Sequence, residues 1–385
     1  MTTFVFEQPG KMVFGRGSLS KVGEIVAKLG SGALLVTGRN FATGSGYLSK
    51  LVNSLKDAGL AVTVFAEVEP DPSISTVDRG SRLAEKENID VVVGFGGGSA
   101  LDAAKAIAAA AKLGGSAGDH LYPKTVEEAL PIVAAPTTTG TGSEVTQYSV
   151  LLDPFIGRKV VMQGAAIIPR VALLDPDVTD YMPGRLVAGT GFDALSHALE
   201  AFLSRRASPL SDLFAREAAT IILRELGSAA RGDRAAREAM MYASMLAGVA
   251  INQAGSTMVH GLGYYLTAKH RVHHGMANAL LLPYVLEYYA EKSGKVETLA
   301  NALGFRDWHS LVLEIIKLEE ETGIPDSLAA IGVSPDELDE MVNDALQYRR
   351  NLENGPVVPE PVEVKKVYEK SLEGRKVFRS ELKHS

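Results

Sequence analysis

The chain has 385 residues, a formal net charge of −7, 46% hydrophobic residues and no cysteine. Its length suits two domains, and its acidic charge argues against nucleic acid as a partner. Without cysteine there are no disulfides or thiolate sites, so any metal must be bound by His, Asp or Glu. This composition is consistent with a cytoplasmic protein, and we expect no membrane-spanning segment because no apolar run is long enough.

Residues 33–135 alternate between predicted strands and helices. The strands are predicted at 33–38, 60–68, 89–98 and 130–136, and the helices at 46–59, 77–89 and 99–115. Because the strands are continuous apolar runs, they indicate a parallel sheet covered on both faces. The first predicted domain, residues 1–180, is therefore a Rossmann-like α/β domain that binds a dinucleotide.

The pattern changes near "LLDPDVTDYMPG", where prolines and a glycine interrupt the periodicity. Beyond this point only helices are predicted, among them 185–204, 209–227, 235–253, 276–291 and 307–321. The second predicted domain, residues 181–385, is therefore all-α, and we expect it to bind metal and substrate.

The segment "GFGGGSALDAAK" lies between a buried strand and a helix. Gly96, Gly97 and Gly98 allow close approach of the backbone to a ligand, Ser99 is a candidate helix cap, and Asp102 would occupy the third helical position. Free N–H groups at a helix N-terminus suit a pyrophosphate. The alternative is a tight turn with a good cap and no ligand.

A second loop, "APTTTGTGSEVT", follows the next predicted strand. It offers the hydroxyls of Thr137, Thr138 and Thr139 and two glycines. Loops at the carboxyl ends of parallel strands face one crevice, so we expect both loops to bind the dinucleotide. The alternative is a flexible turn rich in Thr and Gly.

In "TGFDALSHALEAF" the apolar residues follow the period of a buried helix, while Asp193 and His197 lie one turn apart on one face. One alternative is that Thr190 caps this helix, with Asp193 at its third position and His197 a core histidine. The other is a metal site, which requires further ligands elsewhere in the chain.

Further candidate ligands occur in two later segments. "GSTMVHGLGYYL" places His260 among apolar neighbours, and "KHRVHHGMANALLLP" places His270, His273 and His274 before an apolar helix. Asp193, His197, His260 and either His273 or His274 would supply one carboxylate and three imidazoles. That set suits Fe²⁺, Zn²⁺ or another divalent ion.

Taken together, these motifs resemble those of the iron-containing (group III) alcohol dehydrogenases, which include lactaldehyde reductases, 1,3-propanediol dehydrogenases and butanol dehydrogenases. The resemblance covers nearly the whole chain and rests on five segments in the family's order: 96–108, 136–146, 167–178, 191–202 and 273–283. It implies a dehydroquinate synthase-like architecture, NAD(P)-dependent oxidation of a primary or secondary alcohol or the reverse reduction, and a homodimer or larger homo-oligomer.

The resemblance also implies roles for individual residues. The metal ligands would be Asp193, His197, His260 and His274, the second histidine of the "HHG" pair. The nucleotide-binding set would be Gly96, Gly97, Gly98, Ser99, Thr137, Thr138, Thr146, Lys159 near the ribose, and Asp71 near the nicotinamide. His270 and His273 are the candidates for proton transfer, and each is alternatively a residue that orients a metal ligand.

The chain departs from the family pattern at two places. Tyr264 stands where many members have a second histidine, four residues after the ligand that matches His260. Gly38 replaces an acidic residue that NAD-preferring members often carry, and the following Arg39 could pair with a 2′-phosphate. The second departure favours NADP(H) over NAD(H).

Three other functions are alternatives. A glycerol-dehydrogenase-like or dehydroquinate-synthase-like enzyme would typically use one carboxylate and two histidines, so His197 argues for the iron type. A metal phosphohydrolase would not need two nucleotide loops on a parallel sheet. A nucleotide-binding protein without turnover would be expected to lack a ligand, yet all four positions are filled.

Overall fold

The computed structural model describes residues 3–379. The chain divides into two compact units. The α/β unit comprises Glu7–Tyr181, and the helical unit begins at Met182 and also includes the N-terminal segment up to Phe6. In the helical unit the ring of Phe6 stacks on that of Phe214, with centroids 5.8 Å apart. We describe each unit by itself.

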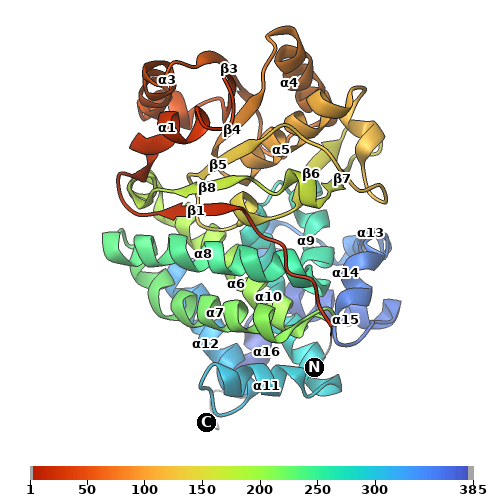
Figure 1. Cartoon of the computed structure of the whole chain (residues 1–385). Helices are drawn as coiled ribbons and strands as arrows, with labels where there is room; N and C mark the ends of the chain where they lie inside the picture. Colours follow the sequence, from red (N-terminus) through yellow and green to blue (C-terminus); the bar gives the residue numbers. More distant parts are fainter. Residues whose placement is uncertain (1–2, 380–385) are drawn as a thin grey trace. The chain divides into compact units, whose positions relative to one another are not determined.

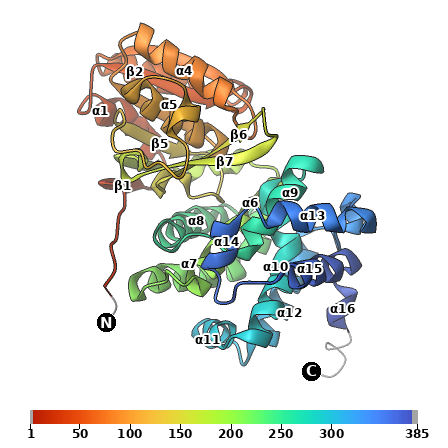
Figure 2. The ribbon, with the colours of Figure 1, turned by 90° about the vertical axis from the view of Figure 1, so that its right-hand side faces the viewer.

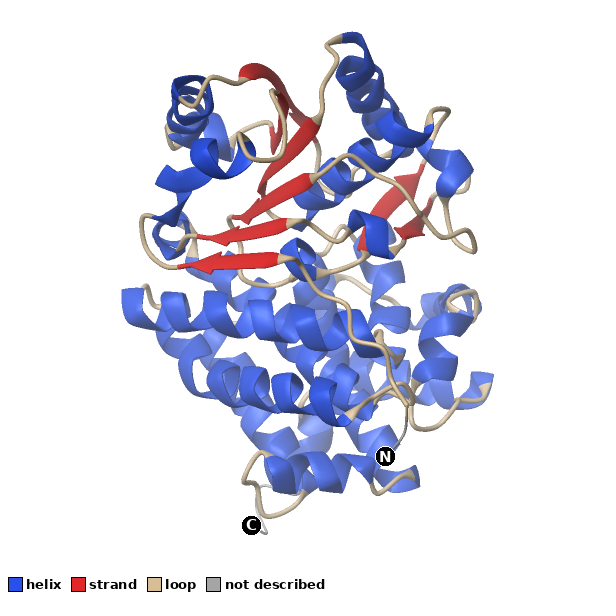
Figure 3. Ribbon diagram, viewed as in Figure 1, coloured by secondary structure: helices blue, strands red, loops and turns tan. Residues whose placement is uncertain are grey.

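The α/β unit is built on a six-stranded parallel sheet (Figures 1 and 3). The strand order is β1-β8-β5-β4-β2-β3. The bounds are β1 Lys11–Phe14, β2 Gly32–Gly38, β3 Ala61–Val68, β4 Val91–Gly96, β5 Ile132–Pro136 and β8 Val171–Leu174. Every residue of β4 and β5 is buried, which confirms the prediction that the sheet is covered on both faces.

Helices cover the sheet from both sides, as Figure 2 also shows. They are α1 Val22–Val26, α2 Phe41–Gly44, α3 Tyr47–Asp57, α4 Ile74–Lys86 and α5 Gly98–Leu113. The chain moves outward from β2 to β3, then back past β2 to β4 and on to β5. Since parallel crossovers are right-handed, α3 lies on one face and α4 and α5 lie on the other.

The four predicted strands and three predicted helices between residues 33 and 135 are confirmed as β2 to β5 and α3 to α5. The sequence did not predict β1, β8 or an antiparallel hairpin of β6 Tyr148–Asp153 and β7 Arg158–Gln163. Strand β1 is four residues long and mostly exposed, and the hairpin strands are only partly buried. These three strands therefore lack the buried apolar run that marked the central strands, whereas β8 is apolar and buried but only four residues long.

The helical unit contains no strand among its described residues. Its bounds are α6 Gly184–Leu203, α7 Pro209–Ala230, α8 Arg234–Ala254, α9 Met258–Lys269, α10 His274–Lys292, α11 Lys295–Ala302, α12 Trp308–Thr322, α13 Leu338–Ala345, α14 Arg349–Asn354, α15 Pro361–Glu373 and α16 Lys376–Arg379. All five helices predicted here are confirmed to within three residues at each end. None of the helices described is both long and apolar enough to span a bilayer.

Candidate metal and nucleotide sites

Three predicted metal ligands meet inside the helical unit. Asp193 of α6, His260 of α9 and His274 at the start of α10 each present one ligand atom, and these atoms lie within 4.8 Å of one another. Asp193 Oδ1 is 3.8 Å from Nε2 of both histidines. Asp193 and His260 are buried, and His274 is partly exposed. One carboxylate and two imidazoles form a donor set that suits a divalent transition-metal ion.

Helices α6 and α10 approach closely here because both carry glycine at the contact. A Cβ on Gly275 would lie 1.9 Å from the carbonyl oxygen of Gly189 and 2.9 Å from the Cβ of Asp193. No side chain fits between the two backbones. This contact places His274, the residue before Gly275, beside Asp193.

The structure contradicts the alternative reading of Asp193. Helix α6 begins at Gly184, so Thr190 lies inside it and donates its hydroxyl to the Leu186 carbonyl at 2.9 Å. Asp193 is therefore in the middle of a buried helix, where no helix dipole accounts for its charge. Burial would raise the pKa of Asp193, but the surrounding histidines, His197 and His274 foremost, lower it to about 2.

His197 lies next to this cluster, although it is not one of the three residues whose ligand atoms converge. Its ring stacks on that of His260, with centroids 4.7 Å apart and an angle of 18° between the planes. Because His197 follows Asp193 by one helical turn, it faces the same side of α6. His197 thus lies beside the cluster of which the family resemblance makes it a ligand.

Glu200 is a residue of this site that the sequence analysis missed. Its side chain is 1% exposed, and Oε2 is paired with Nδ1 of His260. Oε1 accepts hydrogen bonds from the backbone N–H of Thr257 and Val259 and from the Thr257 hydroxyl. Glu200 therefore fixes the tautomer of His260 and leaves Nε2 as its ligand atom. A charged residue seven positions after Asp193, hence on the same face, was the available signal.

We expect Glu200→Gln to lower the affinity for the metal about 10- to 100-fold, because an amide holds the His260 ring less firmly than a carboxylate does. The measurement is a competition titration of metal-free protein with Fe²⁺ or Zn²⁺. The control is Glu321→Gln. Glu321 forms an exposed ion pair with Arg231, so this change should leave the metal affinity unchanged. Equal affinities for the two variants would exclude this role for Glu200.

Asn278, a second missed residue, donates from its amide nitrogen into the centre of the cluster. Nδ2 is 2.9 Å from Asp193 Oδ1 and 3.4 Å from Nε2 of both His260 and His274. Its Oδ1 is buried without a hydrogen-bond partner in the described structure, and a Cβ on Gly263 would lie 2.7 Å from it. One carboxylate oxygen and two imidazole nitrogens thus face one another across a short distance, with the Asn278 amide beside them. The residues present fit a divalent ion.

The remaining aromatic and histidine candidates surround this cluster. Tyr264 lies flat against His274, with centroids 5.7 Å apart and planes 5° apart, and it also contacts the ring of Tyr348. Burial raises the pKa of Tyr264, so its hydroxyl stays neutral. Of the predicted proton-transfer residues, His270 is hydrogen-bonded to Glu337 at 2.8 Å. His273 is the N-cap residue of α10, and its Nδ1 faces Gly189.

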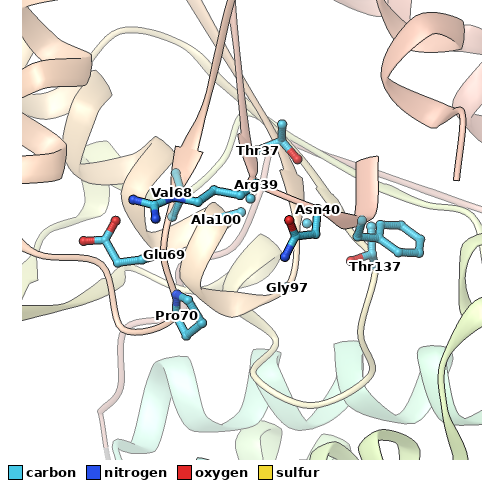
Figure 4. Close-up of a pocket in the computed structure, with 12 residues that line it drawn as sticks. Thr37, Arg39, Asn40, Val68, Glu69, Pro70, Gly97, Ala100 and Thr137 are labelled. Atoms are coloured by element: carbon cyan, nitrogen blue, oxygen red, sulfur yellow. The ribbon is translucent and has the colours of Figure 1, made fainter. Parts of the chain in front are cut away.

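The α/β unit contains a pocket of about 390 Å³ at the carboxyl ends of β2, β3 and β4. The chain runs in opposite directions along the sheet from β2 and from β4, so the pocket lies at the topological switch point. Among the predicted nucleotide residues, Gly38, Arg39, Gly96, Gly97 and Thr137 line it. Figure 4 shows Arg39 and Glu69 on one side of the pocket and Asn40 with Thr137 on the other.

The glycine loop starts a helix as predicted, but with a different cap. Helix α5 begins at Gly98 with Gly97 as N-cap, so Ser99 is not the cap, and its hydroxyl instead accepts a hydrogen bond from the Asp71 N–H at 3.2 Å. Gly96 has φ of 154°, and a Cβ there would be 2.6 Å from the Cβ of Ala100. The free N–H groups at the start of α5 adjoin the pocket.

Two charged residues of opposite sign line the pocket. Arg39 is exposed, and its Nε donates to the Glu67 carbonyl at 3.1 Å. Glu69, which the sequence analysis missed, accepts hydrogen bonds from Ser73 and Thr76 at the start of α4. Burial opposes the effect of these hydrogen bonds, but together they lower the pKa of Glu69.

The other predicted nucleotide residues lie outside the lining of this pocket. Lys159 forms an ion pair with Asp71 at 2.9 Å. Thr138 lies beside Gly97, where an added Cβ would be 3.3 Å from its side chain, and Gly98 faces Thr141. The hydroxyl of Thr146 points inward, where it accepts a hydrogen bond from Lys105.

Comparisons with known proteins identify one family across both units. Residues 9–176 match the model of the family described as "Iron-containing alcohol dehydrogenase", and residues 187–372 match "Fe-containing alcohol dehydrogenase family, C-terminal". The chain is 36% identical over 375 residues to long-chain-alcohol dehydrogenase 1 of Geobacillus thermodenitrificans, covering 94% of each chain.

Solved structures give the same result. An iron-containing alcohol dehydrogenase from Thermotoga maritima is 38% identical with a TM-score of 0.87, covering 96% of this chain and 100% of that one. Sulfoacetaldehyde reductase from Bifidobacterium kashiwanohense, solved in complex with NAD⁺, is 31% identical with a TM-score of 0.89, covering 97% and 99% respectively.

Proposed function

Because this chain belongs to the iron-containing alcohol dehydrogenase family, we propose that its buried Asp193, His260 and His274 hold the catalytic divalent metal of an NAD(P)-dependent alcohol dehydrogenase. The protein is an oxidoreductase that interconverts an alcohol and its aldehyde or ketone with NAD(P). The convergence of the three ligand atoms from three helices is the observation that carries the proposal. The family models favour this reading over the dehydroquinate-synthase-like and phosphohydrolase alternatives. The three converging ligand atoms, one carboxylate and two imidazoles, do not by themselves separate it from the first of these.

The metal and the cofactor divide the chemistry. A bound divalent ion supplies Lewis acidity at the substrate oxygen, and nicotinamide carries the hydride. The protein's own residues hold His260 in one tautomer through Glu200 and keep Asp193 ionised among imidazoles. We propose Fe²⁺ as the ion from the family, and His197 as the fourth ligand because its ring already adjoins His260.

A proton must leave the site during alcohol oxidation, and we propose that His273 carries it. His273 is the residue before the ligand His274, and its ring lies against the α6 backbone at Gly189. It also interacts electrostatically with Asp193. His270, by contrast, is held by Glu337 and is the weaker candidate. We also propose a homodimer or larger homo-oligomer and a cytoplasmic location, from the family and the composition.

The reaction is tested with protein loaded with Fe²⁺ under anaerobic conditions. Short alcohols, diols and aldehydes are offered with NAD⁺, NADP⁺ and their reduced forms, and absorbance of the reduced nicotinamide is followed. We expect reversible, substrate-dependent turnover with at least one short alcohol. Protein that is folded and loaded with metal but gives no nicotinamide turnover with any substrate would contradict the proposal.

We further propose that Arg39 gives a preference for NADP(H), because Gly38 stands where NAD-preferring members often carry an acidic residue and the adjacent Arg39 lines the pocket. Arg39→Ala should raise the Kd for NADPH about tenfold and leave the Kd for NADH within about twofold, since only NADPH has a 2′-phosphate. Arg158→Ala, an exposed arginine outside the pocket lining, is the control. A wild type that binds NADH more tightly than NADPH would show that the carboxylate of Glu69 outweighs Arg39.

A further inference from the structure

Lys105 lies in the middle of α5 and is completely buried, which is rare for a lysine. Burial lowers its pKa, while the nearby carboxylates Asp102 and Glu144 oppose that effect. A buried lysine is tolerated only where its three N–H groups have partners. Its partners therefore show what the residue does.

Within residues 3–379, every oxygen that pairs with Lys105 belongs either to its own helix or to one segment, residues 143–148. The Nζ atom donates to the Ser143 carbonyl at 3.0 Å and to the Thr146 hydroxyl and carbonyl at 3.3 and 3.4 Å. It also donates to the carbonyl of Tyr148, at the start of β6, and pairs with Asp102 at 3.4 Å. Segment 143–148 contains the end of the second nucleotide loop and the first residue of β6.

Asp102, one turn before Lys105, binds the same segment from the other side. Its Oδ1 accepts from the Ser143 hydroxyl at 2.5 Å, and its Oδ2 accepts from the Val150 N–H at 2.9 Å. The Asp102 carbonyl accepts from the Ser149 hydroxyl at 2.8 Å. Asp102, which is partly buried, and the buried Lys105 thus form an ion pair whose other side-chain hydrogen bonds among the described residues reach the second loop and β6.

The same helix begins at the glycine loop. Gly97 and Gly98 leave space that the side chains of Thr138 and Thr141 occupy, since an added Cβ would lie 3.3 and 2.5 Å from them. The two nucleotide loops are therefore in contact at the start of α5 and are joined again, two turns later, through Lys105. A shift of the second loop would break contacts at both places.

We propose that Lys105, with Asp102, is a positioning residue for nucleotide binding, fixing the second loop against α5 so that the two loops form one binding surface. This inference rests on the proposed use of NAD(P) by this unit. Lys105 does not line the pocket, so it acts through the loop and not through contact with nucleotide.

The test compares Lys105→Met with Lys112→Met. Lys112 is in the same helix, but its side chain is about half exposed, and its ion pair with Glu128 is long, at 3.9 Å. Three quantities are measured on metal-loaded protein: the Kd and KM for NADPH, kcat at saturating NADPH, and the metal content. For Lys105→Met we expect Kd and KM to rise about tenfold or more, with kcat and metal content within about twofold of the control. Amide hydrogen exchange should accelerate in residues 137–148.

The outcomes separate a positioning role from a general one. If Lys105→Met lowers metal content and kcat as much as it weakens NADPH binding, the residue supports the fold as a whole and the proposal is overturned. Equal NADPH affinity for the two lysine variants also overturns it. If Lys105→Met does not fold, Asp102→Asn decides by the same criteria, because it removes the carboxylate charge from the ion pair with little change of shape. A wild type that binds neither NADPH nor NADH would contradict the proposed function itself.

Discussion

Replacing His260 with alanine is expected to abolish stoichiometric metal binding and to lower kcat/KM for alcohol oxidation by at least about 10³-fold. Loss of the ion removes several kcal/mol of transition-state charge stabilisation, and each 1.4 kcal/mol is about a tenfold change in rate. His260 supplies one of three converging ligand atoms and is held in place by Glu200. Metal analysis and steady-state kinetics on the same preparation measure both effects.

The control is His309→Ala, an exposed histidine on α12 that stacks only on its neighbour Trp308 among the described rings. It should retain full metal content and full turnover. NADPH affinity should be unchanged in the His260→Ala variant, because the nucleotide pocket belongs to the other unit. If His260→Ala kept both metal and turnover, the assignment of this cluster would be wrong.

Gly275→Ala should destabilise the protein by about 3 kcal/mol or more and should also weaken metal binding. The added methyl group would lie 1.9 Å from the Gly189 carbonyl oxygen, which is backbone and cannot rotate away. Helices α6 and α10 must then separate, and Asp193 and His274 would separate with them. Denaturant unfolding of the metal-free protein measures the stability, and metal titration measures the second effect.

Gly294→Ala is the matched control, because a Cβ there has no neighbour within 4 Å and φ is −68°. Its free energy of unfolding should change by no more than about 0.5 kcal/mol. If Gly275→Ala were as stable as Gly294→Ala, the close contact of α6 and α10 would not be what places His274 beside Asp193.

The central part of the fold was predictable because its signals are local. Strands β2 to β5 are continuous apolar runs, and α3 to α5 show helical periodicity, with a glycine just after α3 and α5. The missed elements give weaker signals, and the apolar run of β8 is only four residues long. Strand β1 is short and mostly exposed, and the hairpin of β6 and β7 depends on contacts with α5 that no local pattern encodes.

The candidate metal site was predictable as a set of residue types, and less so as a geometry. Spacing left His273 and His274 equivalent, and only the family resemblance separated them. In the structure His274 joins the cluster, since Gly275 brings the start of α10 against α6. Glu200 and Asn278 were missed because each looks like an isolated polar residue in an apolar helix until α9 is placed beside it.

Lys105 was missed for a different reason. In the Ala-rich segment "SALDAAKAIAAAAKLGG" a lysine is expected at the surface, as Lys112 of the same helix is. Its burial depends on the return of the chain through residues 143–148, about forty positions later. Likewise, the prediction that Ser99 caps the helix was wrong, because its hydroxyl accepts a hydrogen bond from the backbone N–H of Asp71, in the loop after β3.

The most direct test of the account counts the ions bound per chain. Metal-free wild type and the double variant Asp193→Ala, His274→Ala are titrated with Fe²⁺ under anaerobic conditions, and NAD(P)-dependent alcohol oxidation is followed at each addition. We expect one ion per wild-type chain, with turnover rising in proportion to occupancy, and neither binding nor turnover in the double variant. Full turnover by the metal-free wild type, or equal ion binding by the double variant, would contradict a catalytic metal at this cluster.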